Sequence, residues 1–208
     1  LQGDWSSDVC SSDLIALRVI HHGSEPVGED AFLKLLERAI DWRVKTWKLD
    51  EQTDAYRVVN SDGDGLSGLM VDRYGDTLSI EVHSLGVYQR LPQWLPVLHE
   101  KLGTKREVIQ VEERSARNEG IHHQPLTGHS VKIREHGVRY EVNFTSGHKT
   151  GFFCDQRDNR RKFAQLVAGR RTLDLCCYTG GFAVAAAVLG GSADVTGVDL
   201  DEDAIAQA

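Results

Sequence analysis

The stretch from Arg171 to Asp199 constrains the fold of this chain most. It runs through an apolar and β-branched strand, a turn with Gly180 and Gly181, an alanine-rich helix, a glycine stop and a second strand that ends in Asp199. Strands that alternate with helices in this way form parallel sheets. The spacing predicts a buried first strand and half of a nucleotide-binding βαβ unit in an α/β fold.

The turn and the two acids around it indicate which nucleotide could bind. Gly180 and Gly181 let the backbone approach a ligand, and the following helix directs N–H groups at it. Asp199 follows Gly180 by about 20 residues, the spacing of an acid that binds a ribose diol. This pattern fits NAD, FAD and S-adenosylmethionine alike, and a βαβ unit without any ligand is the plain alternative. Asp174 would repel a pyrophosphate, and no G-x-G-x-x-G pattern is present, so the residues favour S-adenosylmethionine.

Basic charge gathers just before this unit. The whole chain has 208 residues and a net charge of −7, which argues against a broad phosphate-binding surface. Between Gly147 and Arg171, however, basic residues far outnumber acidic ones: Lys149, Arg157, Arg160, Arg161, Lys162, Arg170 and Arg171 stand against Asp155 and Asp158. Local charge of this kind predicts that the segment presents a nucleic acid.

The N-terminal third is expected to contain few elements. Residues 1–13 have no periodic apolar pattern and are set aside as a disordered or foreign segment, and residues 14–53 are expected to form a linker region with a strand and a helix. The strand covers Leu14–Ile20, and the helix runs from Glu29 to about Lys48. Apolar residues at helical spacing predict one buried stripe: Phe32, Leu36, Ile40, Val44 and Trp47.

Residues 54–145 predict a central α+β domain, because the apolar period changes from 3.6 to 2. We expect a β-meander of Tyr56–Asn60, Leu69–Tyr74 and Thr77–His83, a helix at Tyr88–Leu102, a strand at Glu107–Val111 and a hairpin at Ser130–Phe144. In residues 146–208 a helix at Asp155–Val167, with Phe163 and Leu166 inward, precedes the βαβ stretch.

Three separated motifs carry a resemblance to a known family. Gly147–Arg160, Asp174–Val184 and Asn60–Tyr74 are similar to class I S-adenosylmethionine-dependent ribosomal RNA methyltransferases of the bacterial large-subunit 5-methylcytosine type, and the likeness runs from Leu14 to Ala208. Cys176 and Tyr178 stand where the wider superfamily has glycines. The resemblance implies the N-terminal part of a Rossmann-like class I methyltransferase fold preceded by a small α+β domain.

The resemblance also implies a role for each matching residue. Lys149, Phe153, Asp155, Gln156 and Arg157 would line the methionine end of the cofactor, Asp174, Tyr178, Thr179 and Gly181 would form the turn around it, and Asp199 would hold the ribose. Arg157 could pair with the cofactor carboxylate. A solvated cation beside Asp158 is the alternative for Arg157.

Methylation at cytosine C5 would need a cysteine that adds to C6 and a base that removes the C5 proton. Cys176 and Cys177 are rejected for this role, because they end the cofactor strand and small cysteines commonly serve packing. In the family the nucleophile and an Asp-Pro-Pro turn lie on later strands, so we expect both beyond Ala208 and predict no catalytic residue within the chain. We also expect truncation at the N-terminus, where the family has a small RNA-binding domain.

The predicted function is therefore S-adenosylmethionine-dependent methyl transfer to RNA, at C5 of a cytosine in large-subunit ribosomal RNA. Methylation of another RNA base, a protein or a small molecule stays open. So does a non-catalytic RNA-binding or assembly module built on Asp54–Phe144. RNA is the expected partner, and a homodimer is left open.

The sequence argues against several other kinds of site. The longest apolar run, Phe182–Leu189, is far too short to span a bilayer, which predicts a cytoplasmic protein with no membrane partner. The Asp62-Gly-Asp64-Gly loop lacks the later ligands of a calcium site, and paired histidines in loops are weak metal candidates. No Cys-x-x-Cys pair occurs, so we expect reduced thiols and no metal.

Overall fold

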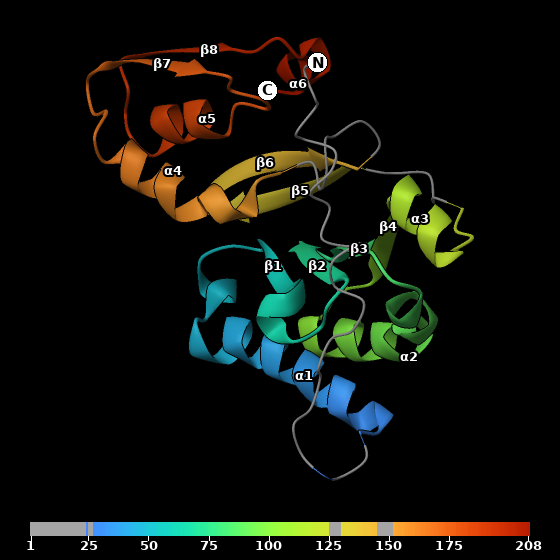
Figure 1. The fold of residues 1–208 in the computed structure, drawn as a ribbon. Coiled ribbons are helices and arrows are strands. Elements are labelled where there is room, and N and C mark those ends of the chain that lie inside the picture. Colours follow the sequence, from blue (N-terminus) through green and yellow to red (C-terminus); the bar gives the residue numbers. More distant parts are fainter. Residues whose placement is uncertain (1–23, 25–26, 125–129, 145–151) are drawn as a thin grey trace.

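The computed structural model describes residues 24, 27–124, 130–144 and 152–208, and its elements are stacked in layers (Figure 1). Two long helices lie under a four-stranded sheet, a β-hairpin lies on the other side of that sheet, and a βαβ unit lies beyond the hairpin. The predicted strand at Leu14–Ile20 and the predicted site residue Lys149 fall outside the described residues.

The central sheet has the order β1 (Ala55–Asn60), β2 (Leu69–Tyr74), β3 (Thr77–Val82) and β4 (Arg106–Val111). The first three strands are antiparallel, which confirms the meander, and β4 returns parallel to β3 after helix α2 (Leu85–Leu102). Helices α1 (Glu29–Asp41) and α2 cover one face of the sheet with a core that includes Leu36, Ile40 and Trp94. A short helix α3 (Glu113–Glu119) follows β4.

Helix α1 begins at Glu29 as predicted but changes geometry at Trp42. Residues Trp42–Thr46 form a π-helical turn, in which the Trp47 amide donates to the Trp42 carbonyl at 2.9 Å. The extra residue in this turn rotates the following side chains around the axis. As a result Arg43 is buried and Trp47 is 52% exposed, so the prediction that Trp47 belongs to the buried stripe is wrong.

The hairpin consists of β5 (Ser130–Glu135) and β6 (Val138–Asn143) and confirms the predicted turn. His136 and Gly137 both have positive φ, 49° and 86°, as a two-residue turn between twisted strands requires. Burial alternates along both strands. The buried side chains form a second core with Tyr74 of β2 and Phe152, which joins the hairpin to the central sheet.

The C-terminal unit consists of β7 (Arg171–Leu175), α5 (Gly181–Val188) and β8 (Asp194–Val198), with α4 (Arg157–Ala164) before it and α6 (Glu202–Gln207) after it. Strands β7 and β8 pair in parallel, which confirms the βαβ prediction. The prediction of a buried β7 is wrong in part: Leu173 and Leu175 are 60% and 66% exposed, because the strand turns Thr172 and Asp174 toward the α5 side. Leu166 is also exposed rather than inward, because α4 ends at Ala164 and the chain leaves the helical axis before Leu166.

Candidate cofactor site

The turn between β7 and α5 has an unusual backbone conformation. Cys176, Tyr178 and Gly180 have φ values of 59°, 51° and 71°, in the left-handed region that non-glycine residues avoid. Two hydrogen bonds hold the turn: the Cys177 amide donates to the Val198 carbonyl at 3.1 Å, and the Gly180 amide donates to the Cys177 carbonyl at 2.9 Å. Backbone strain of this kind clusters at ligand sites and switch regions.

Asp199 lies directly after β8, opposite this turn. Its Oδ2 accepts a hydrogen bond from the Tyr178 amide at 2.7 Å, and its Oδ1 accepts one from the Asp201 amide at 3.0 Å. These two bonds hold the pKa of the Asp199 carboxyl below its usual range. The group is therefore a fixed, ionised acceptor, and its remaining lone pairs are suited to a ribose diol.

Asp174 lies on β7 and faces the start of α5. Its Oδ2 accepts a hydrogen bond from the Ala183 amide at 3.0 Å, which satisfies one of the amides at the helix N-terminus. Burial raises the pKa of this carboxyl, and the nearby Asp199 charge adds to the rise. The two acids of the site thus differ in how readily they take a proton.

An aromatic contact joins the segment before α4 to the turn. The rings of Phe153 and Tyr178 meet edge to face, with centroids 5.6 Å apart. Phe153 is partly exposed. The structure therefore brings together two residues that the sequence assigned to one site from separate motifs.

Arg160 holds this arrangement in place, and the sequence analysis missed that role. Its guanidinium donates to both carboxylate oxygens of Glu135 at 2.7 Å, and its Nη1 donates to the Phe153 carbonyl at 3.1 Å. Arg160 and Glu135 are both buried. Sequence reading placed Arg160 in a basic cluster, because nothing in the sequence marks the hairpin residue Glu135 as its partner.

Other predicted residues of this segment face elsewhere. Asp155 and Arg157, together with Phe153, line a pocket of about 1050 Å³ beside the central sheet. Gln156 donates to Asp155 at 2.9 Å, and the Arg157 Nε donates to Asp158 at 3.3 Å. The Arg157 side chain is only 15% exposed, so it is not the solvated cation of the alternative interpretation. Thr179 and Gly181 lie in the turn and at the start of α5.

Two of the three cysteines near the site do not have the character of nucleophiles. Cys154 and Cys177 are buried, and burial raises the pKa of both thiols. Cys176 is exposed, contrary to the view of both adjacent cysteines as packing residues, because its left-handed backbone turns it outward. A raised pKa keeps a thiol protonated, whereas the thiolate is the reactive form.

Neither a metal site nor a membrane span is found within the described ranges. No group of three His, Cys, Asp or Glu side chains there could hold a metal ion. Asp64, from the loop compared with a calcium site, instead forms a buried pair with Arg43 at 2.7 and 2.9 Å. No helix in this part of the chain is long and apolar enough to cross a membrane.

Comparison with known proteins agrees with this geometry. The parallel βαβ unit, the strained turn and the acid after the second strand define the class as Rossmann-like, class I S-adenosylmethionine-dependent methyltransferases. The family model described as S-adenosylmethionine-dependent methyltransferase matches residues 97–207. The chain belongs to this family of enzymes, whose cofactor is S-adenosylmethionine.

The curated relatives of this chain are methyltransferases named for ribosomal RNA. The chain is 36% identical to "Ribosomal RNA large subunit methyltransferase I" of Aeromonas hydrophila, over 98% of this chain and 52% of the relative. It is 34% identical to "Ribosomal RNA large subunit methyltransferase" of Deinococcus radiodurans, over 93% of this chain and 50% of the relative. The chain thus spans about half the length of the curated relatives it matches.

Solved structures show the same fold. A SAM-dependent methyltransferase from Streptococcus mutans superposes with a TM-score of 0.72 at 29% identity, over 91% of this chain and 50% of that chain. A second methyltransferase structure, complexed with SAH, gives a TM-score of 0.71 at 29% identity, over 89% of this chain and 48% of that one.

Proposed function

We propose that the protein transfers a methyl group from S-adenosylmethionine to RNA, at C5 of a cytosine in large-subunit ribosomal RNA. The observation that carries the cofactor part is Asp199, an ionised carboxylate fixed by the Tyr178 and Asp201 amides at the end of β8. A ribose diol is the group that an acid at this position of a βαβ unit binds.

The proposed roles of the remaining site residues depend on where they lie relative to Asp199. Tyr178, Thr179 and Gly181 would surround the cofactor at the turn, and Asp174 would attract its ammonium group. Phe153 would close the turn through its contact with Tyr178. The proposed methionine-end set is completed by Lys149, Asp155, Gln156 and Arg157.

Two observations support RNA as the acceptor. The curated relatives are named for large-subunit ribosomal RNA, and basic residues gather in the segment before β7. Methylation at cytosine C5 requires an accessible cysteine thiolate that adds to C6 of the base. The raised pKa of the Cys177 thiol supports the prediction that Cys177 is not the nucleophile, and the buried Cys154 thiol also has a raised pKa. Cytoplasmic location and a homodimer remain predictions.

Isothermal titration calorimetry with S-adenosylhomocysteine tests the cofactor site. Asp199→Ala should weaken binding at least about tenfold, because charge-assisted hydrogen bonds to hydroxyls are lost. Asp194→Ala, at the exposed start of the same strand, is the matched control and should leave affinity unchanged. Equal affinities for the wild type and Asp199→Ala would refute the proposed role of Asp199.

The target base is tested separately by methyl transfer. Tritiated S-adenosylmethionine and a ribosomal RNA substrate labelled at cytosine C5 with deuterium should give release of that deuterium in step with methylation. Methylation without loss of the C5 label would exclude the C5 assignment and favour another position of the RNA.

A further inference from the structure

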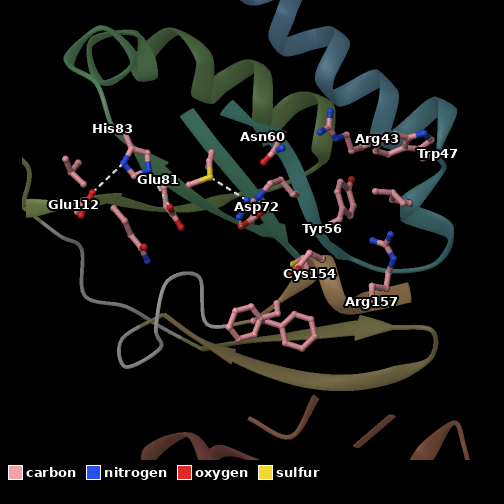
Figure 2. Close-up of a pocket in the computed structure, with 18 residues that line it drawn as sticks. Arg43, Trp47, Tyr56, Asn60, Asp72, Glu81, His83, Glu112, Cys154 and Arg157 are labelled. Atoms are coloured by element: carbon pink, nitrogen blue, oxygen red, sulfur yellow. Dashed lines mark hydrogen bonds and ion pairs between the residues drawn. The ribbon is translucent and has the colours of Figure 1, made fainter. Parts of the chain in front are cut away.

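A large pocket lies on the face of the central sheet that α1 and α2 leave uncovered (Figure 2). Its volume is about 1050 Å³, at the upper end of the range for ligand pockets. The sheet contributes polar side chains that alternate with the buried core residues. Cross-strand pairing places Arg57 beside Asp72 and Glu81 beside Gln110.

The two ends of this pocket differ in chemistry. Figure 2 shows Arg43, Trp47 and Arg157 toward one end. His83, Glu81 and Glu112 lie toward the other. A pocket with an aromatic end and a carboxylate end is suited to a flat group that also carries hydrogen-bond donors.

At the first end, Trp47 is exposed but held in place. The π-helical turn directs its ring outward, and the neighbouring Arg43 is fixed by its buried pair with Asp64. The Arg43 guanidinium also lies 5.5 Å from the centre of the Trp47 ring, within range of a cation–π interaction. A fixed, half-exposed indole is a stacking platform for a nucleobase.

At the second end, carboxylates supply acceptors. The Glu81 side chain is 18% exposed, and His83 lies 3.6 Å from its Oε2 and 3.9 Å from Glu112. The deeper carboxylate of Asp72 accepts hydrogen bonds from the Nε and Nη2 of Arg57, both at 2.9 Å. Carboxylates accept hydrogen bonds from the exocyclic amino group of cytosine, whereas uracil presents a carbonyl oxygen there.

The pocket shares Phe153, Asp155 and Arg157 with the proposed methionine end of the cofactor site. Phe153 lines the pocket, and its ring also contacts Tyr178. A group bound in the pocket would therefore lie next to the proposed methionine end of the cofactor site.

We propose that this pocket binds an unpaired RNA segment, with Trp47 stacking on one base and Glu81 accepting a hydrogen bond from the exocyclic amino group of a neighbouring base. The inference rests on the proposed function, because RNA as the acceptor is part of that function. It goes further by assigning recognition of the base to residues of the central sheet and of the turn after α1.

Fluorescence anisotropy of the full chain with labelled single-stranded hexanucleotides, one rich in cytidine and one in uridine, tests the proposal at about 50 mM salt. Trp47→Ala should weaken binding of the cytidine-rich RNA about tenfold, since one stacking contact is lost. Val27→Ala is the control: Val27 is an apolar side chain, 39% exposed before α1, that does not line the pocket, and its loss should change affinity less than about twofold.

Glu81→Gln tests recognition of the amino group. The amide removes the negative charge and replaces one of the two acceptor oxygens by an NH2 donor, which can also pair with the uracil carbonyl, so the preference for cytidine over uridine should fall about fivefold or more. Glu100→Gln, exposed on α2 under the opposite face of the sheet, removes the same charge and should preserve that preference. An unchanged preference in Glu81→Gln, equal effects of Trp47→Ala and Val27→Ala, or no RNA binding by the wild type would each overturn the proposal.

Calorimetry with S-adenosylhomocysteine separates this inference from the proposed function. Trp47→Ala and Glu81→Gln should bind S-adenosylhomocysteine like the wild type, whereas Asp199→Ala should lose it and still bind RNA. Normal cofactor binding with failed RNA tests would overturn the pocket alone. Failed cofactor binding with successful RNA tests would overturn the methyltransferase site and leave the pocket.

Discussion

The central sheet and the C-terminal βαβ unit contrast in how they are covered. Strands β1 to β3 are mostly buried, with α1 and α2 on one face and the hairpin over part of the other face, which also carries the pocket. In β7 and β8, Leu173, Leu175 and Val198 are largely exposed. Parallel sheets normally have both faces covered, so in this chain, which spans about half the length of its curated relatives, the β7–β8 pair buries less apolar surface than the central sheet. Packing energy is thus concentrated in the central sheet, whereas the strained cofactor turn lies in the other region.

One buried ion pair connects the two regions. Arg160 on α4 and Glu135 on the hairpin are 3% and 2% exposed, and Arg160 also holds the Phe153 carbonyl. The cofactor turn therefore depends on the central sheet and the hairpin for its position, but it adds little to the stability of either. Variants in each region should therefore separate stability from binding.

The largest effect is expected in the central core. Trp94 is 1% exposed on α2, and Trp94→Ala should lower the free energy of unfolding by about 3 to 5 kcal/mol. Leu175→Ala in β7 should cost less than about 0.5 kcal/mol, because the side chain is exposed. Urea denaturation followed by circular dichroism measures both values.

A more conservative change sharpens this test. The buried Trp94 Nε1 has no hydrogen-bond partner within the described residues, so Trp94→Phe removes an unsatisfied donor while keeping an aromatic ring. It should cost clearly less than Trp94→Ala. Equal losses in Leu175→Ala and Trp94→Ala would contradict the contrast between the regions.

The next effect concerns the ion pair between the regions. Arg160→Met leaves the Glu135 carboxylate buried without its partner and should cost about 3 kcal/mol. Adding Glu135→Leu should recover much of this loss, because no buried charge then remains. If the double variant regains stability but still binds S-adenosylhomocysteine weakly, Arg160 also positions Phe153. Wild-type stability in Arg160→Met alone would exclude a structural role for the pair.

Two glycines allow a matched test of backbone strain in each region. Gly103, after α2, and Gly180, in the cofactor turn, have φ values of 65° and 71°. Either Gly→Ala change should lower the free energy of unfolding by about 1 to 2 kcal/mol, because alanine is strained in the left-handed backbone conformation. Only Gly180→Ala should also weaken S-adenosylhomocysteine binding, measured by calorimetry. Loss of binding in Gly103→Ala would show that the turn responds to stability in general.

The smallest effect is the pH dependence of the two acids. Asp174 has a raised pKa and Asp199 a lowered one, so Asp174 takes its proton first as the pH falls. S-adenosylhomocysteine affinity should therefore begin to fall above the ordinary aspartate pKa of about 3.9. Calorimetry between about pH 7 and pH 4 should show this early fall in the wild type and not in Asp174→Asn.

The two acids have opposite effects on how the stability of the fold depends on pH. The lowered pKa of Asp199 stabilises the fold above the unfolded-state value, and that contribution is lost as the pH falls through the folded-state value. The raised pKa of Asp174 opposes folding at neutral pH, and protonation relieves this. Asp199→Asn should therefore flatten the acid side of the thermal stability profile, whereas a flatter profile in Asp174→Asn would reverse the assignment.

Local patterns were enough to predict most elements. The period-2 runs predicted β1 to β3 and the hairpin, and the strand, glycine and helix order predicted the βαβ unit. They misplaced Trp47 and Leu166, because periodicity assumes an unbroken α-helix. The π-helical turn at Trp42 and the end of α4 at Ala164 both break that assumption.

The sequence by itself determined the order of the elements and the residues of the cofactor turn, since turns, caps and strand periods depend on neighbours along the chain. Only the tertiary structure decided the pairing of Arg160 with Glu135, the contact of Phe153 with Tyr178, and the joining of Trp47 and Glu81 in one pocket. These partners are far apart in sequence. Their proximity depends on how whole layers pack, which no local pattern encodes.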